Sequence, residues 1–479
     1  MPEPRADALG LDFTVELDLV VEVANDARQT DALITVRASR GEGPAAAEAF
    51  AEILIMDRSL SMASHGKLTE AKRAACAAID ALGDGVYLGI IAGNQGSEII
   101  FPAGGGLARV DAEVKAAAKQ RVRGLVADGG TAIGQWLTHA AELFEEAAPA
   151  GAVCHAALYT DGRNQLQSPQ DLELSLARCA DRFVCHPRGL GEDWDYVTLL
   201  RIAEALHGEA RAVVEISDLA ADFARLTRDA QRLLVPRVYL GLLRLGPLFR
   251  VGRIRQVSPV EAELTHQRPG EGRDVHVPLG AWSAGSRQYR LSLTFDAETL
   301  PVEEELQAAR VTLLAEAADG TRRECVVGVP LPVRRSEFGA PLPAPSREFT
   351  NVERFHELGE TIRACADAWL AREFAEAGRE LGRAIQLAEA LGDTVRLRLL
   401  NAIADVEDGR TIVRRDATRG QIQELGVWSR APGVMSDKAV NDLEEPVEVH
   451  VCPACGEETQ GQDALACESC GRRFVDEAP

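Results

Sequence analysis

The stretch ILIMDRSLS at residues 53–61 joins a fully apolar run to a polar loop. A short run of this kind is typical of a strand that is buried on both faces of a sheet. Further mainly apolar runs stand at VYLGIIAG (86–93), AVCHAALYT (152–160), RFVCHPRGL (182–190) and ARAVVEI (210–216). Apolar residues at helical spacing accompany them, at residues 67–82, 111–125, 132–148, 169–180, 196–208 and 219–234. This alternation predicts a doubly wound α/β domain over residues 47–234, with a mostly parallel sheet covered by helices on both faces.

The sequence on either side of this domain alternates between apolar and polar residues, as half-buried antiparallel strands do. Two such strands precede it, at residues 13–23 and 32–38, and two strands are too few to fold alone. The same alternation returns at residues 238–245, 249–258, 289–295, 309–317 and 324–333. We therefore expect residues 1–46 and 235–335 to form one β-sandwich into which the α/β domain is inserted.

The remaining third of the chain divides at two irregular stretches. Residues 336–350, rich in proline and small residues, are predicted to be a linker. Residues 351–425 are predicted to be a helical region, because residues 354–408 have apolar residues at helical spacing that fit about three helices, resembling a short helical-repeat hairpin. One such unit buries little core by itself, so we expect it to dock on another part of the protein. A second linker, residues 426–446, leads to a cysteine-containing end at residues 447–475.

Length and composition indicate a globular protein of two to four domains. The chain has 479 residues and a formal net charge of −22, and only 5% of its residues are aromatic, which argues against nucleic-acid binding. The positive charge is nearly all arginine, and we give this bias no functional weight. We see no secretory signal and no membrane-spanning segment, so the expected location is the cytoplasm and no membrane partner is expected. The six scattered cysteines are accordingly expected to be reduced thiols.

Polar side chains gather at the ends of two strands and at the start of a helix. Asp57, Ser59 and Ser61 follow the first α/β strand, and alternate side chains of such a turn converge on one point. Thr131 follows Gly129-Gly130 and precedes a helix, while Asp161 directly follows the strand 152–160. Ligands of parallel sheets bind at the carboxyl ends of the strands. Carboxylate and hydroxyl oxygens suit hard divalent cations, Mg²⁺ in particular.

The order Asp-x-Ser-x-Ser, then Thr, then Asp resembles the metal-ion-dependent adhesion site of von Willebrand factor A domains, and the resemblance covers about residues 50–232. It implies that Ser59, Ser61 and Thr131 contact Mg²⁺, or Mn²⁺ or Ca²⁺, directly. It also implies that Asp57 and Asp161 act largely through coordinated water, and that a carboxylate of a partner completes the coordination. Leu60 departs from the family pattern, since many members have glycine there.

The end of the chain carries two Cys-x-x-Cys-Gly knuckles, whose spacing lets both thiolates of a pair reach one ion. Four thiolates in a reducing compartment make a closed, structural zinc site, and so small a module requires its ion to fold. The motif resembles the zinc ribbons of bacterial regulatory proteins. The predicted Zn²⁺ ligands are Cys452, Cys455, Cys467 and Cys470.

These parts together predict a metal-dependent interaction scaffold rather than an enzyme. Resemblance to bacterial cytoplasmic von Willebrand A proteins implies partners such as serine/threonine kinases, phosphatases, forkhead-associated proteins or a MoxR-type ATPase. Thr459, in the loop between the knuckles, is then a candidate phosphorylation site. Two alternatives stay open. One is an RNA-binding protein of this family, and the other is a metal-dependent hydrolase with His65 as its general base.

Overall fold

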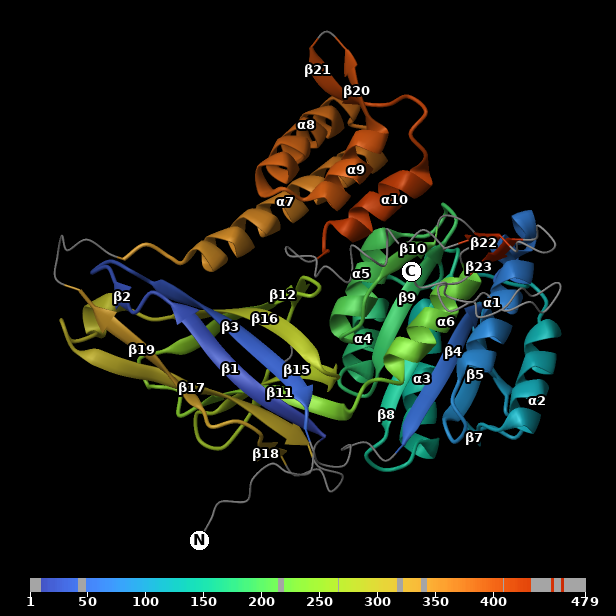
Figure 1. The fold of residues 1–479 in the computed structure, drawn as a ribbon, viewed down its shortest axis with the longest axis horizontal. Helices are drawn as coiled ribbons and strands as arrows, with labels where there is room; N and C mark the ends of the chain where they lie inside the picture. Colours follow the sequence, from blue (N-terminus) through green and yellow to red (C-terminus); the bar gives the residue numbers. More distant parts are fainter. Residues whose placement is uncertain are drawn as a thin grey trace, which may run out of the picture. The chain divides into compact units, whose positions relative to one another are not determined.

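The computed structural model describes residues 10–41, 49–213, 219–265, 267–316, 322–336, 343–407, 409–431, 449–451 and 458–460. Residues 1–433 form one compact unit and residues 434–479 a second (Figure 1). Among the helices of the described ranges, none is both long and apolar enough to cross a membrane.

The central α/β segment holds a mixed sheet in the order β10-β9-β8-β4-β5-β6, with β7 beside β5. Strands β4, β5, β8, β9 and β10 are parallel, and β6 and β7 run antiparallel to β5. The sheet is therefore mostly parallel, as predicted, but its antiparallel edge was not foreseen from sequence. The strands are β4 (Phe50–Asp57), β5 (Tyr87–Gly93), β6 (Ser97–Phe101), β7 (Ala108–Arg109), β8 (Val153–Thr160), β9 (Val184–Leu190) and β10 (Arg211–Val213).

Helices cover both faces of this sheet. Alternate residues of β4 point to opposite faces, and each face packs against its own group of helices. Ile53 and Ile55 pack with α3, α4 and α5, whereas Leu54 and Met56 pack with α1, α2 and α6. Figure 1 shows β4 with α4 and α5 on one side and α1 and α2 on the other. The helices are α1 (Lys67–Ala81), α2 (Ala112–Arg123), α3 (Ile133–Ala147), α4 (Pro169–Cys179), α5 (Tyr196–Ala205) and α6 (Leu219–Ala230).

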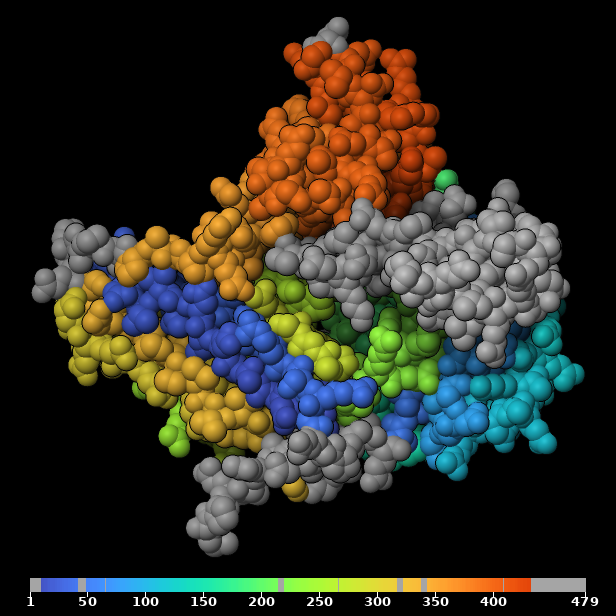
Figure 2. Space-filling model, viewed as in Figure 1, coloured from blue at the N-terminus to red at the C-terminus, as the bar shows by residue number. Residues whose placement is uncertain are grey.

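The strands outside the α/β segment form two further sheets. The first has the order β1-β3-β16-β12-β13, and the second β14-β15-β11-β17-β19-β2, with β18 beside β17. In Figure 2 the blue N-terminal strands lie beside the yellow strands from the later part of the chain. The strands are β1 (Leu11–Leu19), β2 (Glu22–Val23), β3 (Gln29–Arg40), β11 (Val235–Leu243), β12 (Arg250–Ser258), β13 (Ala262–Glu263), β14 (Arg268–Pro269), β15 (Val275–Trp282), β16 (Gly285–Thr294), β17 (Glu305–Glu316), β18 (Arg322–Glu324) and β19 (Val329–Arg335).

Strands from both ends of this region contribute to one hydrophobic core. Val36 of β3 and Leu291 of β16 belong to the same buried cluster as Leu240 of β11 and Val311 of β17. Strand β15 was not predicted from the sequence, and it contains Pro278 and Gly280.

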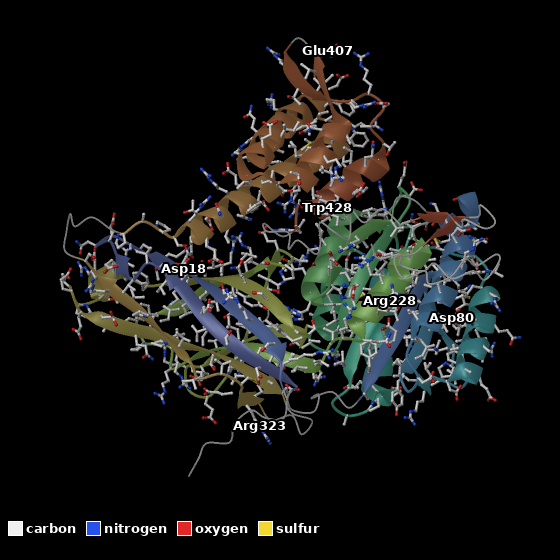
Figure 3. The ribbon with its side chains drawn as sticks, in the orientation of Figure 1. Asp18, Asp80, Arg228, Arg323, Glu407 and Trp428 are labelled. Carbon is white, nitrogen blue, oxygen red and sulfur yellow. The ribbon has the colours of Figure 1, made fainter. Side chains whose placement is uncertain are left out.

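The helical region after residue 343 contains four helices and a β-hairpin. They are α7 (Arg347–Leu370), α8 (Phe374–Leu391), α9 (Thr394–Ile403), β20 (Ala404–Glu407), β21 (Arg410–Val413) and α10 (Arg419–Trp428). Figure 3 marks Glu407 at the end of the hairpin and Trp428 at the end of α10, at opposite ends of this region. The helical pattern that we extended to residue 408 is wrong from Ala404 onward, where the chain instead turns at Gly409, with φ of 72°, into paired strands.

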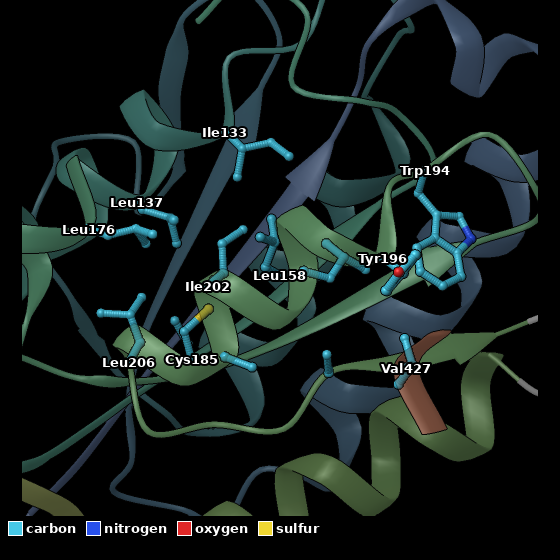
Figure 4. Close-up of a cluster of buried hydrophobic side chains, with 14 of the residues drawn as sticks. Ile133, Leu137, Leu158, Leu176, Cys185, Trp194, Tyr196, Ile202, Leu206 and Val427 are labelled. Atoms are coloured by element: carbon cyan, nitrogen blue, oxygen red, sulfur yellow. The ribbon is translucent and has the colours of Figure 1, made fainter. Parts of the chain in front are cut away.

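The helical region shares its core with the α/β segment. Leu358, Ile362 and Leu425 belong to the buried cluster that contains Trp194 and Tyr196, and Figure 4 shows Val427 close to those two aromatic rings. The amide of Tyr196 donates a hydrogen bond of 2.8 Å to Gln423 Oε1 of α10. The expectation that the helices dock on another part of the protein is therefore confirmed for this contact.

The second unit contributes one described pair of strands, β22 (Val449–Val451) and β23 (Glu458–Gln460), which are antiparallel. The four predicted zinc ligands, Cys452, Cys455, Cys467 and Cys470, lie outside the described residues, as does the side chain of Thr459.

A cluster of titratable groups lies inside the α/β segment. Glu52 Oε2 is 2.7 Å from His155 Nδ1, and the rings of His155 and His186 are 5.1 Å apart. The amide of Glu209 donates to His186 Nδ1 at 3.0 Å. Burial, followed by the charges of His155, Arg188 and Arg211, holds the pKa of His186 well below its ordinary value of 6.5.

Replacing His186 by asparagine is expected to flatten the pH dependence of stability. Below pH 6.5 His186 becomes protonated in the unfolded chain, whereas it stays neutral in the folded chain because its pKa there is lower. The free energy of unfolding therefore falls as pH decreases. This loss is at most about 1.4 kcal/mol per pH unit. Asparagine keeps an acceptor for the Glu209 amide. Urea unfolding at neutral and mildly acidic pH measures the effect, and equal slopes in both proteins would contradict it.

Candidate metal centre

The site begins at the last residue of β4, the middle strand of the sheet. Asp57 is 1% exposed, and its Oδ1 accepts a hydrogen bond of 2.7 Å from the amide of Ser59. The Asp57–Ser61 loop is fixed to its neighbours by backbone bonds, from Arg58 N to Gly93 O at 2.8 Å and from Leu60 N to Gly129 O at 2.9 Å. The 3₁₀ helix η1 (Leu60–Gly66) then leads into α1.

The loop after β8 meets the Asp57–Ser61 loop. Thr160 Oγ1 donates to Asp57 Oδ2 at 2.6 Å, and Ser61 Oγ donates to Asp161 Oδ1 at 2.7 Å. The hydroxyl oxygens of Ser59 and Ser61 are 3.0 Å apart. Carboxylate and hydroxyl oxygens from two separate strand ends thus lie within hydrogen-bond reach of one another.

Thr131 lies beside the same two loops, because its hydroxyl packs closely against Gly162, which has no side chain. A Cβ on Gly162 would lie 2.9 Å from Thr131 Oγ1, so an alanine there would displace Thr131, and 3.6 Å from Asp57 Oδ2, which is an ordinary contact. Thr131 is 2% exposed. The structure therefore brings all five side chains predicted from sequence to one place, and their binding of a metal stays a prediction. The side chain of His65 lies outside the described part of the chain.

Lys67, at the start of α1, is the residue that sequence reasoning missed. Its Nζ lies 2.7 Å from Asp161 Oδ2 and 3.5 Å from Asp193 Oδ2, and its side chain is only 8% exposed. Burial favours the neutral amine, but the hydrogen bond and the charge of Asp161 outweigh it and raise the pKa of Lys67. The available signal was a lysine six residues after Ser61, at the start of the next helix, in a chain whose cations are mostly arginine.

The charge balance of the site follows from these contacts. Burial raises the pKa of the Asp57 carboxyl to about 6, hydrogen bonds from Ser59 and Thr160 oppose the rise, and the charge of Asp161 adds to it. With both carboxylates ionised, two negative charges and the Lys67 ammonium leave one net negative charge. The five side chains offer hydroxyl and carboxylate oxygens as metal ligands, and neither sulfur nor nitrogen. Such a set of ligands fits a hard divalent cation.

Comparison with known proteins agrees with this geometry. Residues 52–212 match the model of the von Willebrand factor type A domain. The structure is similar to a von Willebrand factor type A protein from Catenulispora acidiphila, with 30% sequence identity and a TM-score of 0.81. The match covers 90% of this chain and 99% of the other. The chain belongs to the von Willebrand factor type A family. Domains of this family are commonly protein-interaction modules.

A second solved structure resembles this von Willebrand A protein in fold alone. It is the ArnB paralog VWA2 from Sulfolobus acidocaldarius, with 15% identity and a TM-score of 0.51 over 89% of this chain and 100% of the other. No protein of curated function matches the sequence.

Proposed function

We propose that Asp57, Ser59, Ser61, Thr131 and Asp161 bind a divalent cation, with Mg²⁺ best suited, and that the cation ligates a carboxylate of a protein partner. The observation that carries this proposal is the meeting of hydroxyl and carboxylate oxygens from three loops at the carboxyl edge of the sheet, with Ser61 Oγ 2.7 Å from Asp161 Oδ1. Alternate hydroxyls and few carboxylates suit a metal that keeps some water ligands.

The charge of the site explains why a partner carboxylate would be attracted. Lys67 already neutralises one of the two carboxylates, which leaves the site with one net negative charge. A bound divalent cation changes the net charge of the site from one negative to one positive. An acidic side chain then replaces a water on the metal with a favourable charge balance, so the function is ligation in a scaffold or adaptor, without catalysis.

The test compares what the full-length protein captures from its native lysate in three conditions. Wild type with Mg²⁺, wild type with EDTA, and Ser59→Ala/Ser61→Ala with Mg²⁺ are compared side by side. A partner recovered only in the first condition, and lost after mutation of its acidic segment, supports the proposal. Recovery of the same partners in all three conditions would contradict it.

The α/β segment is, in our interpretation, an insertion in a β-sandwich. Strands β1 and β3, before the segment, share a core with strands β11, β12, β15, β16, β17 and β19, after it. Phe50 near the start of the segment and Leu233 near its end pack against one small cluster, of Val153, Val184 and Ala281. The two ends of the segment therefore lie close together, as an insertion requires.

The four C-terminal cysteines are proposed to bind one structural zinc. Strand β22 ends at Val451, and its partner β23 begins at Glu458. The two paired strands therefore flank the Cys452-x-x-Cys455 knuckle in the sequence, an arrangement that suits a zinc ribbon.

One zinc per chain is expected in the purified protein, and Cys452→Ser should remove it because three thiolates leave the tetrahedral site incomplete. Elemental analysis measures the metal, and limited proteolysis should show that chelation exposes only the chain after about residue 447. Cys325→Ser, outside the proposed ribbon, is the control and should keep its zinc. A full-length wild type without zinc would refute the ribbon.

A further inference from the structure

Exposed apolar side chains are concentrated around the candidate metal centre. Nine large hydrophobic residues are exposed in the part of the chain that the structure describes, and three of them belong to the loops of this site. They are Leu60, Val126 and Leu166, which are 66%, 70% and 56% exposed. The other six are distributed over the rest of the described chain.

Backbone contacts hold two of these residues beside the proposed ligands. Leu60 stands between Ser59 and Ser61, and its amide donates to Gly129 O at 2.9 Å. The amide of Leu166 donates to Thr131 O at 3.2 Å, and Leu166 Cδ1 lies 3.0 Å from the point where a Cβ on Gly130 would sit. Leu60 and Leu166 thus both contact the Gly129–Thr131 loop.

Val126 lies in the same loop as Thr131, two residues before Asp128. The amide of Asp128 donates to Arg58 O at 2.7 Å, which ties this segment to the Asp57–Ser61 loop. We call Leu60, Val126 and Leu166 the apolar rim. Large apolar side chains at such exposure contribute little to the fold, and a group of them beside polar residues marks an interaction surface.

We infer that the apolar rim binds large apolar side chains that flank the ligating carboxylate of a protein partner. The inference rests on the proposed function, because the bound cation selects the carboxylate while the rim selects its neighbours. The partner segment is therefore an aspartate or glutamate with a leucine, isoleucine, methionine or phenylalanine within one or two residues. Apolar side chains of the partner that pack on the rim would exclude water from the neighbourhood of the bound ion. The lower local dielectric would strengthen the metal–carboxylate contact.

The probe is a displayed library of short random peptides with one fixed central aspartate, selected on the full-length protein in Mg²⁺ and counter-selected in EDTA. Enriched peptides are expected to carry a large apolar residue within two positions of the aspartate. The variant Leu60→Ser/Leu166→Ser should bind the enriched peptides about tenfold more weakly, because two apolar contacts are lost. Val406→Ser, at 69% exposure on β20, is the matched control and should bind them as wild type does.

The outcomes separate this inference from the proposed function. Enrichment of aspartate peptides without an apolar preference, or equal binding by the Leu60→Ser/Leu166→Ser variant, would overturn the rim and leave the metal-dependent ligation standing. Absence of any Mg²⁺-dependent enrichment would overturn both. A calorimetric Mg²⁺ titration of the variant should match wild type, which shows that any loss of peptide binding comes from the rim.

Discussion

Lys67→Met is expected to destabilise the metal-free protein by about 3–5 kcal/mol, since it leaves the carboxylate of Asp161 buried without its partner charge. Asp161 is 0% exposed, and its two oxygens are held by Lys67 Nζ and Ser61 Oγ, each at 2.7 Å. The same change should strengthen Mg²⁺ binding by tenfold or more, because it removes a fixed positive charge that competes for Asp161. Added Mg²⁺ should therefore restore most of the lost stability.

Urea unfolding of wild type and Lys67→Met, each in EDTA and in Mg²⁺, measures both effects. The matched control is Lys119→Met, since Lys119 pairs with Asp80 on the surface, where side-chain exposures are 22% and 58%. Surface pairs of this kind contribute about 0–1 kcal/mol. Equal stability of Lys67→Met and wild type in EDTA would show that the Lys67–Asp161 pair does not stabilise the site.

Tyr196→Ala is expected to lower the free energy of unfolding by about 3–5 kcal/mol and to release the helical region. The Tyr196 ring is 0% exposed, and a Cβ on Gly426 of α10 would lie 2.6 Å from it, so the ring is the surface on which α10 packs. Its hydroxyl also donates a hydrogen bond to Asp367 of α7. Loss of the ring removes the Gly426 contact and the Asp367 hydrogen bond together, and so weakens the packing of both helices on α5.

Limited proteolysis and urea unfolding measure this effect together. Cleavage within residues 343–431 should become faster in Tyr196→Ala than in wild type. Phe374→Ala is the control, because Phe374 lies in the same region but is 57% exposed. If the helical region of Tyr196→Ala resists protease as wild type does, the shared core does not hold the two parts together.

The buried parallel strands and the position of the candidate site could be predicted from the sequence, because both depend on residues that are neighbours in the chain. Runs such as ILIM identify buried parallel strands, and polar residues at the strand ends identify the ligand edge, since every parallel strand presents its carboxyl end there. Asp57, Ser59, Ser61, Thr131 and Asp161 were therefore predictable as one site before their distances were known.

Features that depend on distant contacts were not predictable. The pairing of Lys67 with Asp161 joins residues far apart in sequence, and a lysine at the start of a helix otherwise indicates only solvent exposure. Strand β15 was not predicted from its own residues, and the structure pairs it antiparallel with β11, which is close to it in space rather than adjacent in the chain. The hairpin of β20 and β21 interrupts a helical pattern because Gly409 adopts a positive φ.

The most direct test of the central claim is a calorimetric titration of the zinc-loaded, full-length protein with Mg²⁺. Wild type is expected to bind one Mg²⁺ per chain saturably, and Ser59→Ala/Ser61→Ala to show no binding while its circular dichroism stays that of wild type. Ser283→Ala, at a serine whose hydroxyl donates to Ala284 O at 3.3 Å, serves as the control. Wild type without saturable binding, or a double variant that binds as well as wild type, would contradict a metal centre at these residues.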